Sequence, residues 1–572
     1  LHSPLPWTEE IARLLLVWLM CVGGIRALQE SAHPRVTAIV RLLPPLGRAA
    51  VDRGLQIVLL AFFLCLLVPA WRLTVSSAAE RLPASGISGA AISVMLPVAL
   101  LLMSAVLVQQ LRAGGGGESV PVAWALGTAG LVIASVLVPL VAGAMPLLVM
   151  VIGFLVTAAL GLPLAFTLVL TSATYLVGIG GVSLTILPIK LLGGVDSFVL
   201  LAIPLFILAG ALMESGAISE RIVDLAMAIV GRVRGGLAMV VVVAEVLFSG
   251  ISGSTAADVS AISSLLVPSM KKAGYSGAEA VSVVSAASAM GILVPPCLTM
   301  VVLGSLVNLS IVTLFLAGFL PAFLLAAMLL VLIAVRARRQ GWPVAERASS
   351  ADLGRAARRA VVPLGLPILL FGGIFTGITT VTEAALVAVM YALVVGVATG
   401  GIGRANLVRL LERSGVVTAT TLWVLAAASA FAWILVREWV PQTLGEWITG
   451  LGASRALFLA LTLFVFVVIG ALLEGLPALL IFGPILFPIS RAVGVDPVHY
   501  GIVIVAAMGI AFFLPPVGVG LSIASGIARV DVDEVSRAYW PYLVVLLVGL
   551  ALIAALPGLT LALPRAILGY RG

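Results

Sequence analysis

Long apolar stretches recur from one end of this chain to the other, and no other feature of the sequence constrains its fold as strongly. Each is long enough to cross a hydrocarbon core of about 30 Å at 1.5 Å of helix rise per residue. The strands of outer-membrane barrels alternate in polarity over about ten residues, and runs such as Leu96–Val108 do not alternate. The sequence therefore predicts an all-α polytopic membrane protein. Its apolar spans lie near residues 11–28, 55–71, 86–111, 120–142, 145–180, 197–214, 310–335, 361–378, 383–399, 415–436 and 538–563.

Composition supports this class and excludes a water-soluble globular protein. Of the 572 residues, 62% are hydrophobic and 10% are charged, whereas a soluble domain carries about 25% charged residues. The chain also holds 31 prolines and 59 glycines, which predicts interrupted helices. Backbone groups freed at a break within lipid must be satisfied by neighbouring helices, ions or a wet cavity. We therefore expect the functional residues at the breaks.

The net charge of +8 does not indicate a nucleic-acid partner, because such a partner needs a basic face on a folded soluble domain and no loop is long enough to form one. Arginines instead crowd two segments, 26–53 and 336–359. The positive-inside rule places such segments in the cytoplasm, with the apolar spans among membrane lipids. The sequence holds no Walker-type nucleotide loop and no paired Cys/His spacing. It therefore predicts neither an enzyme nor a transporter driven by an ATPase subunit.

Changes along the chain predict three parts. Residues 1–112 form a first block with few polar groups in its spans. Residues 113–143 contain the glycine run Gly114–Gly117 and a connecting span, and a flexible composition of this kind is typical of a linker between fused parts. Residues 144–572 form a longer block with many more breaks. Within it, two regions around 197–335 and 415–565 follow the same plan, as an internal, inverted repeat would.

The first of these regions predicts a re-entrant hairpin followed by a broken helix. Gly236–Ser249 is an apolar arm too short to span the membrane, and the small, polar tip Gly250–Asp258 joins it to a second short arm that ends at Pro268. Two short arms around a polar tip are typical of a hairpin that dips into the bilayer. The following segment is interrupted at Gly291–Pro296, where a proline pair removes two backbone donors and predicts an unwound middle.

The second region repeats this plan with the tip Glu474–Ala478 and a break at Pro515–Pro516. A shift of 220 positions places Gly250 on Gly470 and the first proline pair on the second, without a gap. Paired segments interrupted by glycine and proline, at corresponding places in two halves, point to the binding site of a secondary transporter near the bilayer midplane. The sequence therefore predicts an ion-coupled carrier of small anions.

The tips and the unwound middles are the candidate sites. Carbonyl oxygens and helix C-terminal ends hold cations, whereas helix N-termini favour carboxylates. Ser252, Gly253 and Ser254 are the first candidate ligands, against the alternative that small residues only permit close helix packing. Asp258 either neutralises a cation or caps the second arm. Ser288 either faces the same cavity or bonds to its own helix.

Three acidic residues and two helices complete this inventory. Glu474 sits at the second tip, whereas Glu383 is favourable at a helix N-terminus without any further role. Glu245 lies in the apolar arm, and the sequence assigns it no role. The segments Ser219–Arg234 and Arg404–Arg413 are charged on one face and apolar on the other, which predicts two helices at the membrane surface.

These motifs resemble the large membrane subunit of the tripartite ATP-independent periplasmic (TRAP) transporters over residues 145–565. The first block resembles the small subunit of the same family, so the chain resembles a fusion of the two. In that family another transmembrane helix precedes the first motif, and we expect this chain to lack it. The segments that carry the resemblance are Pro6–Trp18 and Ala32–Val36 for the small subunit, and Ile203–Gly216, Leu247–Ile262, Val267–Ser276, Gly291–Pro296, Thr382–Leu393, Gly494–Ile502 and Leu514–Gly518 for the large one.

The resemblance implies a sodium-coupled importer of organic acids, dicarboxylates and sialic acid among them, that works by an elevator mechanism in the bacterial cytoplasmic (inner) membrane. A separate periplasmic substrate-binding protein would deliver the substrate, and the first block would enlarge the static scaffold. The residues implied for sodium (Na+) are Ser252, Gly253, Ser254, Asp258, Gly291, Pro295, Gly470, Glu474, Pro477, Ala511 and Pro515. Those implied for the substrate are Ser252, Ser254, Asp258, Ser288, Glu474 and Pro516.

The chain departs from the family pattern at its breaks. The second broken helix of the family usually carries an asparagine, a glycine and a threonine where this chain has Ala507, Ala511 and Leu514, and its first has a serine where Cys297 stands. These replacements remove side-chain oxygens near the second predicted ion. Two alternatives to the tripartite importer stay open at this point: a self-sufficient carboxylate carrier that needs no binding protein, and a passive channel or purely structural membrane protein.

Overall fold

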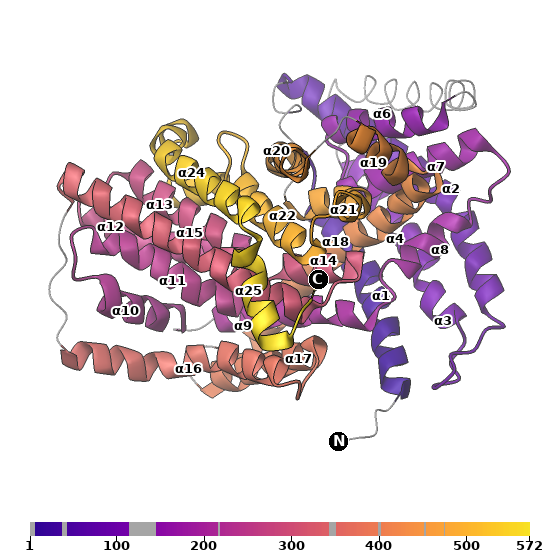
Figure 1. Ribbon diagram of the computed structural model, residues 1–572. Coiled ribbons are helices and arrows are strands. Elements are labelled where there is room, and N and C mark those ends of the chain that lie inside the picture. The colour runs from indigo at the N-terminus through magenta and orange to yellow at the C-terminus, as the bar shows by residue number, and fades with distance from the viewer. Residues whose placement is uncertain are drawn as a thin grey trace. The chain divides into compact units, whose positions relative to one another are not determined.

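The predicted all-α class is confirmed by a computed structural model of the chain (Figure 1). The structure describes residues 6–36, 40, 43–113, 145–214, 218–342, 350–398, 402–450, 454–473 and 475–571. Within these ranges the only β pairing is an isolated bridge between Arg81 and Ser88. Ten of the described helices are long and apolar enough to cross a membrane. The chain is therefore a polytopic helical membrane protein.

The helices group into two compact units, which are taken one at a time. Unit 1 comprises Leu1–Leu201 and Gly415–Pro441, and unit 2 comprises Ala202–Ser414 and Gln442–Gly572. The predicted linker 113–143 lies outside the described residues except for Ala113, the last residue of a helix. The helices of unit 1 are α1 (Pro6–Gln29), α2 (Pro45–Ser77), α3 (Ala90–Ser93), α4 (Met95–Ala113), α6 (Pro146–Ala159), α7 (Leu164–Ile179), α8 (Ile186–Gly193), the 3-10 turn η2 (Phe198–Leu201) and most of α18 (Arg404–Arg437).

Unit 1 packs its helices around an aromatic core. Trp423 of α18 is buried, and its indole N–H donates to the Met20 carbonyl of α1 at 2.9 Å. Its ring meets Phe166 of α7 edge-on, with centroids 5.9 Å apart. Gly24 of α1 lies directly against the indole, since a Cβ at this position would overlap it. A residue far along the chain thus completes the core of the first block.

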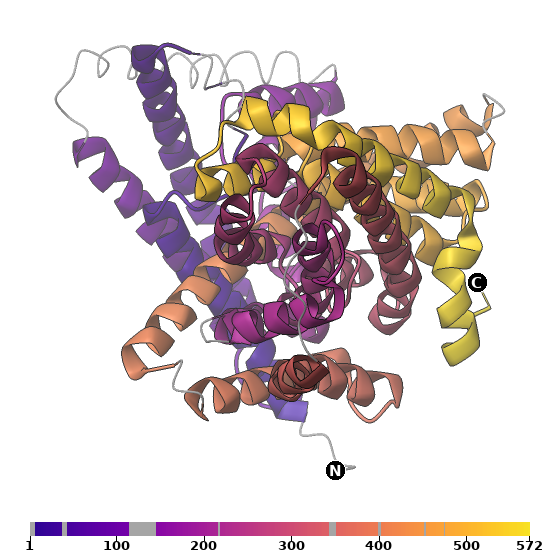
Figure 2. The same cartoon turned by 90° about the vertical axis from the view of Figure 1, so that its left-hand side faces the viewer.

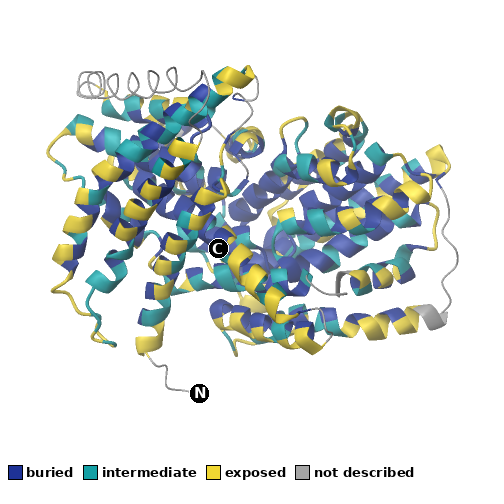
Figure 3. Cartoon of the chain, turned by 180° about the vertical axis from the view of Figure 1, so that it is seen from behind, coloured by how far each residue is buried: buried dark blue, intermediate teal, exposed yellow. Residues whose placement is uncertain are grey.

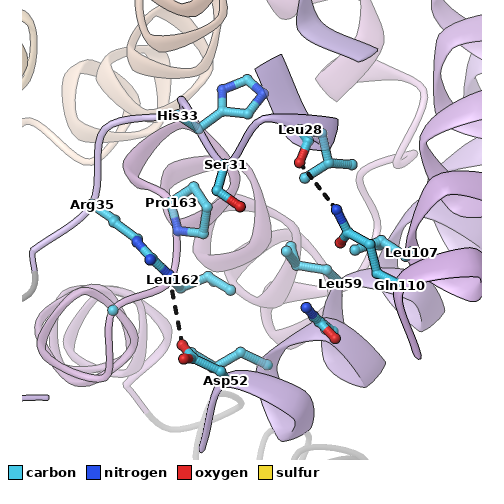
Figure 4. Close-up of a pocket in the computed structure, with 13 residues that line it drawn as sticks. Leu28, Ser31, His33, Arg35, Asp52, Leu59, Leu107, Gln110, Leu162 and Pro163 are labelled. Carbon is cyan, nitrogen blue, oxygen red and sulfur yellow. Dashed lines mark hydrogen bonds and ion pairs between the residues drawn. The ribbon is translucent and has the colours of Figure 1, made fainter. Parts of the chain in front are cut away.

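A cavity of about 200 Å³ lies in unit 1 at the end of α1 (Figure 4). Arg35 and Asp52 form an ion pair across it at 3.6 Å, and the Gln110 amide donates to the Leu28 carbonyl at 3.3 Å. His33 also lines the cavity. None of the residues predicted from the sequence to bind sodium or substrate lines it.

Unit 2 contains both predicted hairpins and both broken helices, whereas residues 197–201 and 415–441 of the predicted regions belong to unit 1 (Figures 1 and 2). Figure 3 shows that buried residues concentrate where helices face one another. The helices are α9 (Ala202–Glu214), α10 (Ile218–Val230), α11 (Gly236–Ser252), α12 (Thr255–Lys272), α13 (Gly277–Gly291), α14 (Leu298–Val307), α15 (Ile311–Gln340), α16 (Ser350–Phe375), α17 (Val381–Ala398), α19 (Val440–Gly450, from Gln442 on), α20 (Arg455–Leu473), α21 (Gly475–Ala492), α22 (Pro497–Phe512), α23 (Val519–Ala528), α24 (Val532–Ala555) and α25 (Pro557–Leu568).

The internal repeat is visible in the helix boundaries. When α11, α12, α13 and α14 are shifted by 220 positions, their ends fall within one residue of those of α20, α21, α22 and α23. The caps correspond as well. Ser276 caps α13 and Asp496 caps α22, in each case by accepting a hydrogen bond from a backbone N–H of the first turn. The same local chemistry therefore starts the broken helix in both halves.

The boundaries of three predicted segments are wrong. Arg404–Arg413 is not a separate surface helix but the start of α18, because no proline interrupts the chain before Arg437. The predicted surface helix Ser219–Arg234 ends earlier, at Val230 of α10. The predicted span 538–563 consists of two helices, α24 and α25, because the proline at the start of α25 cannot continue the preceding helix.

Candidate functional site

The first hairpin turns within two residues, so its tip is narrower than the predicted Gly250–Asp258. α11 runs to Ser252 and α12 starts at Thr255, which places most of the expected tip in helices. Gly253 has a φ of +66°, a left-handed conformation that glycine adopts readily and that reverses the chain in one residue. The Ser254 N–H donates to the Ser252 hydroxyl oxygen at 3.2 Å. The tip therefore consists of Gly253 and Ser254.

This tip packs directly on the break in the next helix. α13 ends at Gly291, α14 begins at Leu298, and every residue between them is buried. The Leu298 N–H donates to the Gly253 carbonyl at 3.3 Å. A Cβ added to Gly253 would lie 2.9 Å from the Pro296 carbonyl oxygen. The structure thus brings the first predicted tip together with the break that contains Pro295.

Asp258 is buried in the first turn of α12, with 2% of its surface exposed. Its Oδ2 accepts a hydrogen bond from the Ser249 hydroxyl of α11 at 2.9 Å, whereas its Oδ1 has no hydrogen-bond partner. Ser252 also lies beside this carboxyl group. Asp258 does not cap the helix, because α12 begins without a side-chain cap. A buried carboxylate oxygen without a donor is costly and is available to a cation.

Glu245 lies one turn before Ser249 on α11 and is fully buried, with its Oε1 3.3 Å from the Ser249 hydroxyl. Ser288 of α13 lies beside the Glu245 carboxyl group. Gly291 packs against this carboxyl group as well, since a Cβ there would lie 2.8 Å from Glu245 Oε1. Sequence reasoning assigned Glu245 no role. The four-residue spacing to Ser249, which places both on one helix face, is the signal that could have drawn attention to it.

The second hairpin has its tip at Glu474, which lies outside the described residues. The helices on either side end and begin directly beside it. Gly470 of α20 faces the second broken helix, since a Cβ added to it would lie 3.0 Å from the Ala511 Cβ. Pro477 is buried in α21. The structure therefore brings together Gly470 and Ala511, two residues that the resemblance implied for sodium.

The two breaks differ in their exposure. Pro295 and Pro296 are buried beneath the first tip, whereas Pro515 is half-buried and Pro516 is exposed between α22 and α23. In both pairs the peptide bond between the prolines is cis. The second break is therefore the more accessible of the two.

The two broken helices cross each other within unit 2. A Cβ added to Gly509 of α22 would overlap the Ala289 carbonyl oxygen of α13 and lie 2.5 Å from the Ile292 side chain. This contact lies within one turn of the first break. It joins the two predicted regions through the helices that lead to their breaks.

The groups near the first tip that could hold a cation are oxygen atoms. No group of three or more His, Cys, Asp or Glu side chains in the described part of the chain forms a metal site. Near the first tip the donors are instead the Asp258 carboxylate, the Ser252 hydroxyl and backbone carbonyls such as that of Pro296. Unwound carbonyls at broken helices are the groups with which secondary transporters coordinate sodium.

The chain is helical, crosses the membrane several times, and contains paired hairpins and paired broken helices. These features define its class as that of a secondary membrane transporter. The chain belongs to the TRAP transporter family. Residues 151–559 match the model of the tripartite ATP-independent periplasmic transporter, DctM component. Residues 1–114 match that of the DctQ component. Both membrane components are therefore present in one chain, as the motifs predicted, and the chain is a transporter permease, not an enzyme.

Relatives with known names agree with this assignment. The chain is 37% identical over 408 residues to the C4-dicarboxylate TRAP transporter large permease protein DctM of Pseudomonas aeruginosa, covering 71% of this chain and 94% of the relative. It is 34% identical over 421 residues to the sialic acid TRAP transporter large permease protein SiaM of Vibrio cholerae, covering 73% and 99%. It is 31% identical over 569 residues to the isethionate TRAP transporter permease protein DctMQ of Oleidesulfovibrio alaskensis, covering 97% and 88%. The chain is thus a multi-pass protein of the bacterial inner membrane.

Proposed function

We propose that this chain is the membrane component of a sodium-coupled symporter that imports a small organic acid from a periplasmic substrate-binding protein. TRAP permeases carry out secondary transport together with such a binding protein and carry organic acids. Sodium as the coupling ion, the substrate class and the elevator movement are the parts that we add. The observation that carries the proposal is the Asp258 carboxylate, buried at the first tip with an oxygen that has no partner.

Charge supports a cation beside Asp258. An ionised side chain at membrane depth costs at least about 2.5 kcal/mol unless it is paired. Among the described residues, no lysine, arginine or histidine forms a salt bridge with Asp258. A sodium ion that also takes oxygen atoms from Ser252, Gly253 and the Pro295–Pro296 break would supply the missing positive charge. All of these groups lie around one tip.

Helix ends support an acidic substrate. α14 and α23 each begin shortly after a proline break, and the first turn of a helix offers unpaired N–H groups and the positive end of the dipole. The second break, with Pro516 exposed, is the more accessible position. The names of the relatives give C4-dicarboxylate, sialic acid and isethionate, which are all organic acids. We therefore assign a small carboxylate or a similar acid to this chain.

Packing supports a movement of the two hairpins as one body. The first tip contacts the first break, Gly470 contacts Ala511, and the broken helices cross at Gly509. Contacts of this kind couple the hairpins to the broken helices. In an elevator mechanism these elements would carry the sodium and the substrate together across the membrane.

Uptake into proteoliposomes tests the proposal. The full chain is reconstituted and offered a radiolabelled organic acid with its binding protein, under an inward sodium gradient or with potassium in place of sodium. We expect uptake only with both sodium and the binding protein. Full uptake without the binding protein would identify a self-sufficient carrier instead. Uptake that is indifferent to the sodium gradient would exclude sodium coupling.

Two substitutions test the ligands. Asp258→Asn and Ser252→Ala should each raise the sodium concentration for half-maximal uptake, by about tenfold for the loss of about 1.4 kcal/mol of binding energy. Ser260→Ala is the matched control, because Ser260 lies two residues beyond Asp258 on α12 and its hydroxyl bonds to its own helix. If a variant folds normally and keeps the wild-type sodium dependence, the ligand role of that residue is wrong.

A further inference from the structure

One lysine at the base of the first hairpin reaches into the second half of the repeat. Lys271 lies in the last turn of α12, and its ammonium group donates a hydrogen bond to the Ala528 carbonyl oxygen at 2.7 Å. Ala528 is the last residue of α23, and the two residues are 257 positions apart along the chain. This bond therefore joins the end of the first hairpin to the end of the half-helix that follows the second break.

The acceptor is a group that a helix leaves without a partner of its own. The last carbonyl groups of a helix accept no hydrogen bond within it and form the negative end of the helix dipole. After Ala528 the chain turns through Arg529, whose φ is +51°, and α23 ends. The Lys271 ammonium group supplies a donor and a positive charge at this end. A hydrogen bond from a charged donor is roughly twice as strong as one between neutral groups.

The lysine side chain also packs against the start of the first broken helix. Gly277 is the first residue of α13, and a Cβ added to it would lie 2.8 Å from Lys271 Cε and 2.8 Å from the Val530 side chain. The end of α12, the start of α13 and the turn after α23 thus meet at Lys271. The three helices also pack against one another.

Neutralisation of a helix end alone does not account for this contact. Lys271 and Lys272 are both exposed residues in the last turn of α12, where a cation is favourable without any second helix. Lys271 in addition lies beside the start of α13, the positive end of a dipole, where a cation is unfavourable. No acidic side chain among the described residues forms a salt bridge with it. The hydrogen bond to Ala528 therefore distinguishes Lys271 from its neighbour.

Both α12 and α23 lead from a candidate site to this junction. α12 begins at Thr255, directly after the first tip, and α23 begins at Val519, shortly after the second proline pair. α23 has ten residues and is about 15 Å long at 1.5 Å per residue, so it is a short rod whose two ends move together. A shift at Ala528 would therefore also move the first turn of α23, at the break to which we assign the acid.

We propose that Lys271 is a positioning residue that holds α23 in register against the first hairpin. Through α23 it keeps the helix N-terminus at the second break in place for the acid, although its ammonium group lies at the far end of the helix and contacts neither the acid nor the ion. The link to the acid rests on the proposed function, whereas the register of α23 does not.

Hydrogen exchange tests the register of α23. The purified full chain in detergent is compared with Lys271→Met, which removes the donor and keeps a long side chain, and with Lys272→Met as the matched control. We expect the backbone amides of α23 to exchange at least about tenfold faster in Lys271→Met, because a hydrogen bond from a charged group is lost. They should exchange at the wild-type rate in Lys272→Met, and Lys271→Arg, which keeps a charged donor, should retain the protection. Equal exchange in Lys271→Met and the wild type would overturn the proposal.

Uptake kinetics distinguish a positioning role from a merely structural one. The variants are reconstituted into proteoliposomes and offered radiolabelled succinate, sialic acid or isethionate, each with its binding protein, under an inward sodium gradient. For the acid that the wild type takes up, Lys271→Met should raise the half-saturating concentration of the loaded binding protein by about tenfold relative to Lys272→Met. The half-saturating sodium concentration, measured with the acid in excess, should not change. A loss confined to the maximal rate would indicate a structural role and overturn the proposal.

The outcomes separate this proposal from the proposed function. If the wild type takes up none of the three acids, the proposed function fails for these substrates, and hydrogen exchange alone decides on the register of α23. If Lys271→Met does not fold, Gly277→Ala replaces it, because the added Cβ crowds the lysine side chain and leaves the ammonium group in place. Faster exchange of α23 in Gly277→Ala supports the proposal, and unchanged exchange contradicts it.

Discussion

Gly509 of α22 lies so close to the backbone of Ala289 in α13 that a Cβ at Gly509 would overlap the Ala289 carbonyl oxygen. The contact joins the two broken helices, one from each half of the repeat. Because the obstacle is backbone and not the end of a flexible side chain, a side chain at position 509 would have to separate the helices. The closeness of the two helices, and with it the geometry of both breaks, depends on this glycine.

Gly509→Ala should therefore destabilise the protein by about 1–3 kcal/mol, as overpacking of a tight contact does. The measurement is the thermal unfolding midpoint of the full chain in detergent. Gly526→Ala is the control, because a Cβ on this glycine of α23 would meet open space, and alanine favours a helix over glycine by up to about 1 kcal/mol. Equal midpoints for the two variants would show that the helices do not cross this closely.

A buried charged network ties α13, α15 and α24 together. The Arg336 guanidinium donates to both Glu279 oxygens, at 3.0 Å and 2.6 Å, and the Tyr542 hydroxyl donates to the same carboxylate. Arg336→Leu leaves Glu279 buried without its partner, which should cost about 3–5 kcal/mol. Adding Glu279→Gln to Arg336→Leu should recover part of that loss. Denaturant or thermal unfolding of the single and double variants measures both effects, and a double variant less stable than either single one would contradict this account.

Because of His33, the stability of the protein should fall in acid. It lies in the connection after α1, outside the spans, and burial lowers its pKa from 6.5 to about 4. The unfolded chain therefore binds more protons between these two values. The contribution of neutral His33 to the free energy of unfolding is complete above pH 6.5 and is lost as the pH falls toward 4. Between pH 7 and pH 5 the free energy of unfolding of the wild type should fall by about 2 kcal/mol because of this group. The fall measured for His33→Gln should be smaller by the same amount.

The order of hairpins and breaks could be predicted from the sequence because its causes are local. A proline pair removes backbone donors wherever it stands, so Pro295–Pro296 and Pro515–Pro516 identify the ends of α13 and α22 without knowledge of the fold. A shift of 220 positions, which matches Gly250 with Gly470 and one proline pair with the other, then revealed the repeat. The same reasoning failed for Arg404–Arg413, where a change in composition without a helix breaker did not end the helix.

The composition of the site could be predicted less well because it depends on contacts between helices. The width of the first tip follows from the left-handed Gly253 and its approach to Pro296, which no spacing in the sequence specifies. Glu245 is a single acid in an apolar arm until α12 and α13 place Asp258 and Ser288 beside it. The predicted ligand roles themselves stay predictions, and that of Glu474 concerns a residue outside the described ranges.

Gly210 of α9 offers a test of the first tip that alters no predicted ligand. A Cβ added to Gly210 would lie 2.6 Å from the Ser252 carbonyl oxygen, and α9 packs along α11 and α17. Gly210→Ala should therefore push the end of α11 away and raise the half-saturating sodium concentration for uptake by about tenfold, equivalent to about 1.4 kcal/mol. Gly372→Ala in α16, where a Cβ meets open space, should leave it unchanged. Because the alanine displaces backbone and removes no oxygen atom, a normal sodium dependence in Gly210→Ala would mean that the position of the Ser252 carbonyl does not matter for the ion.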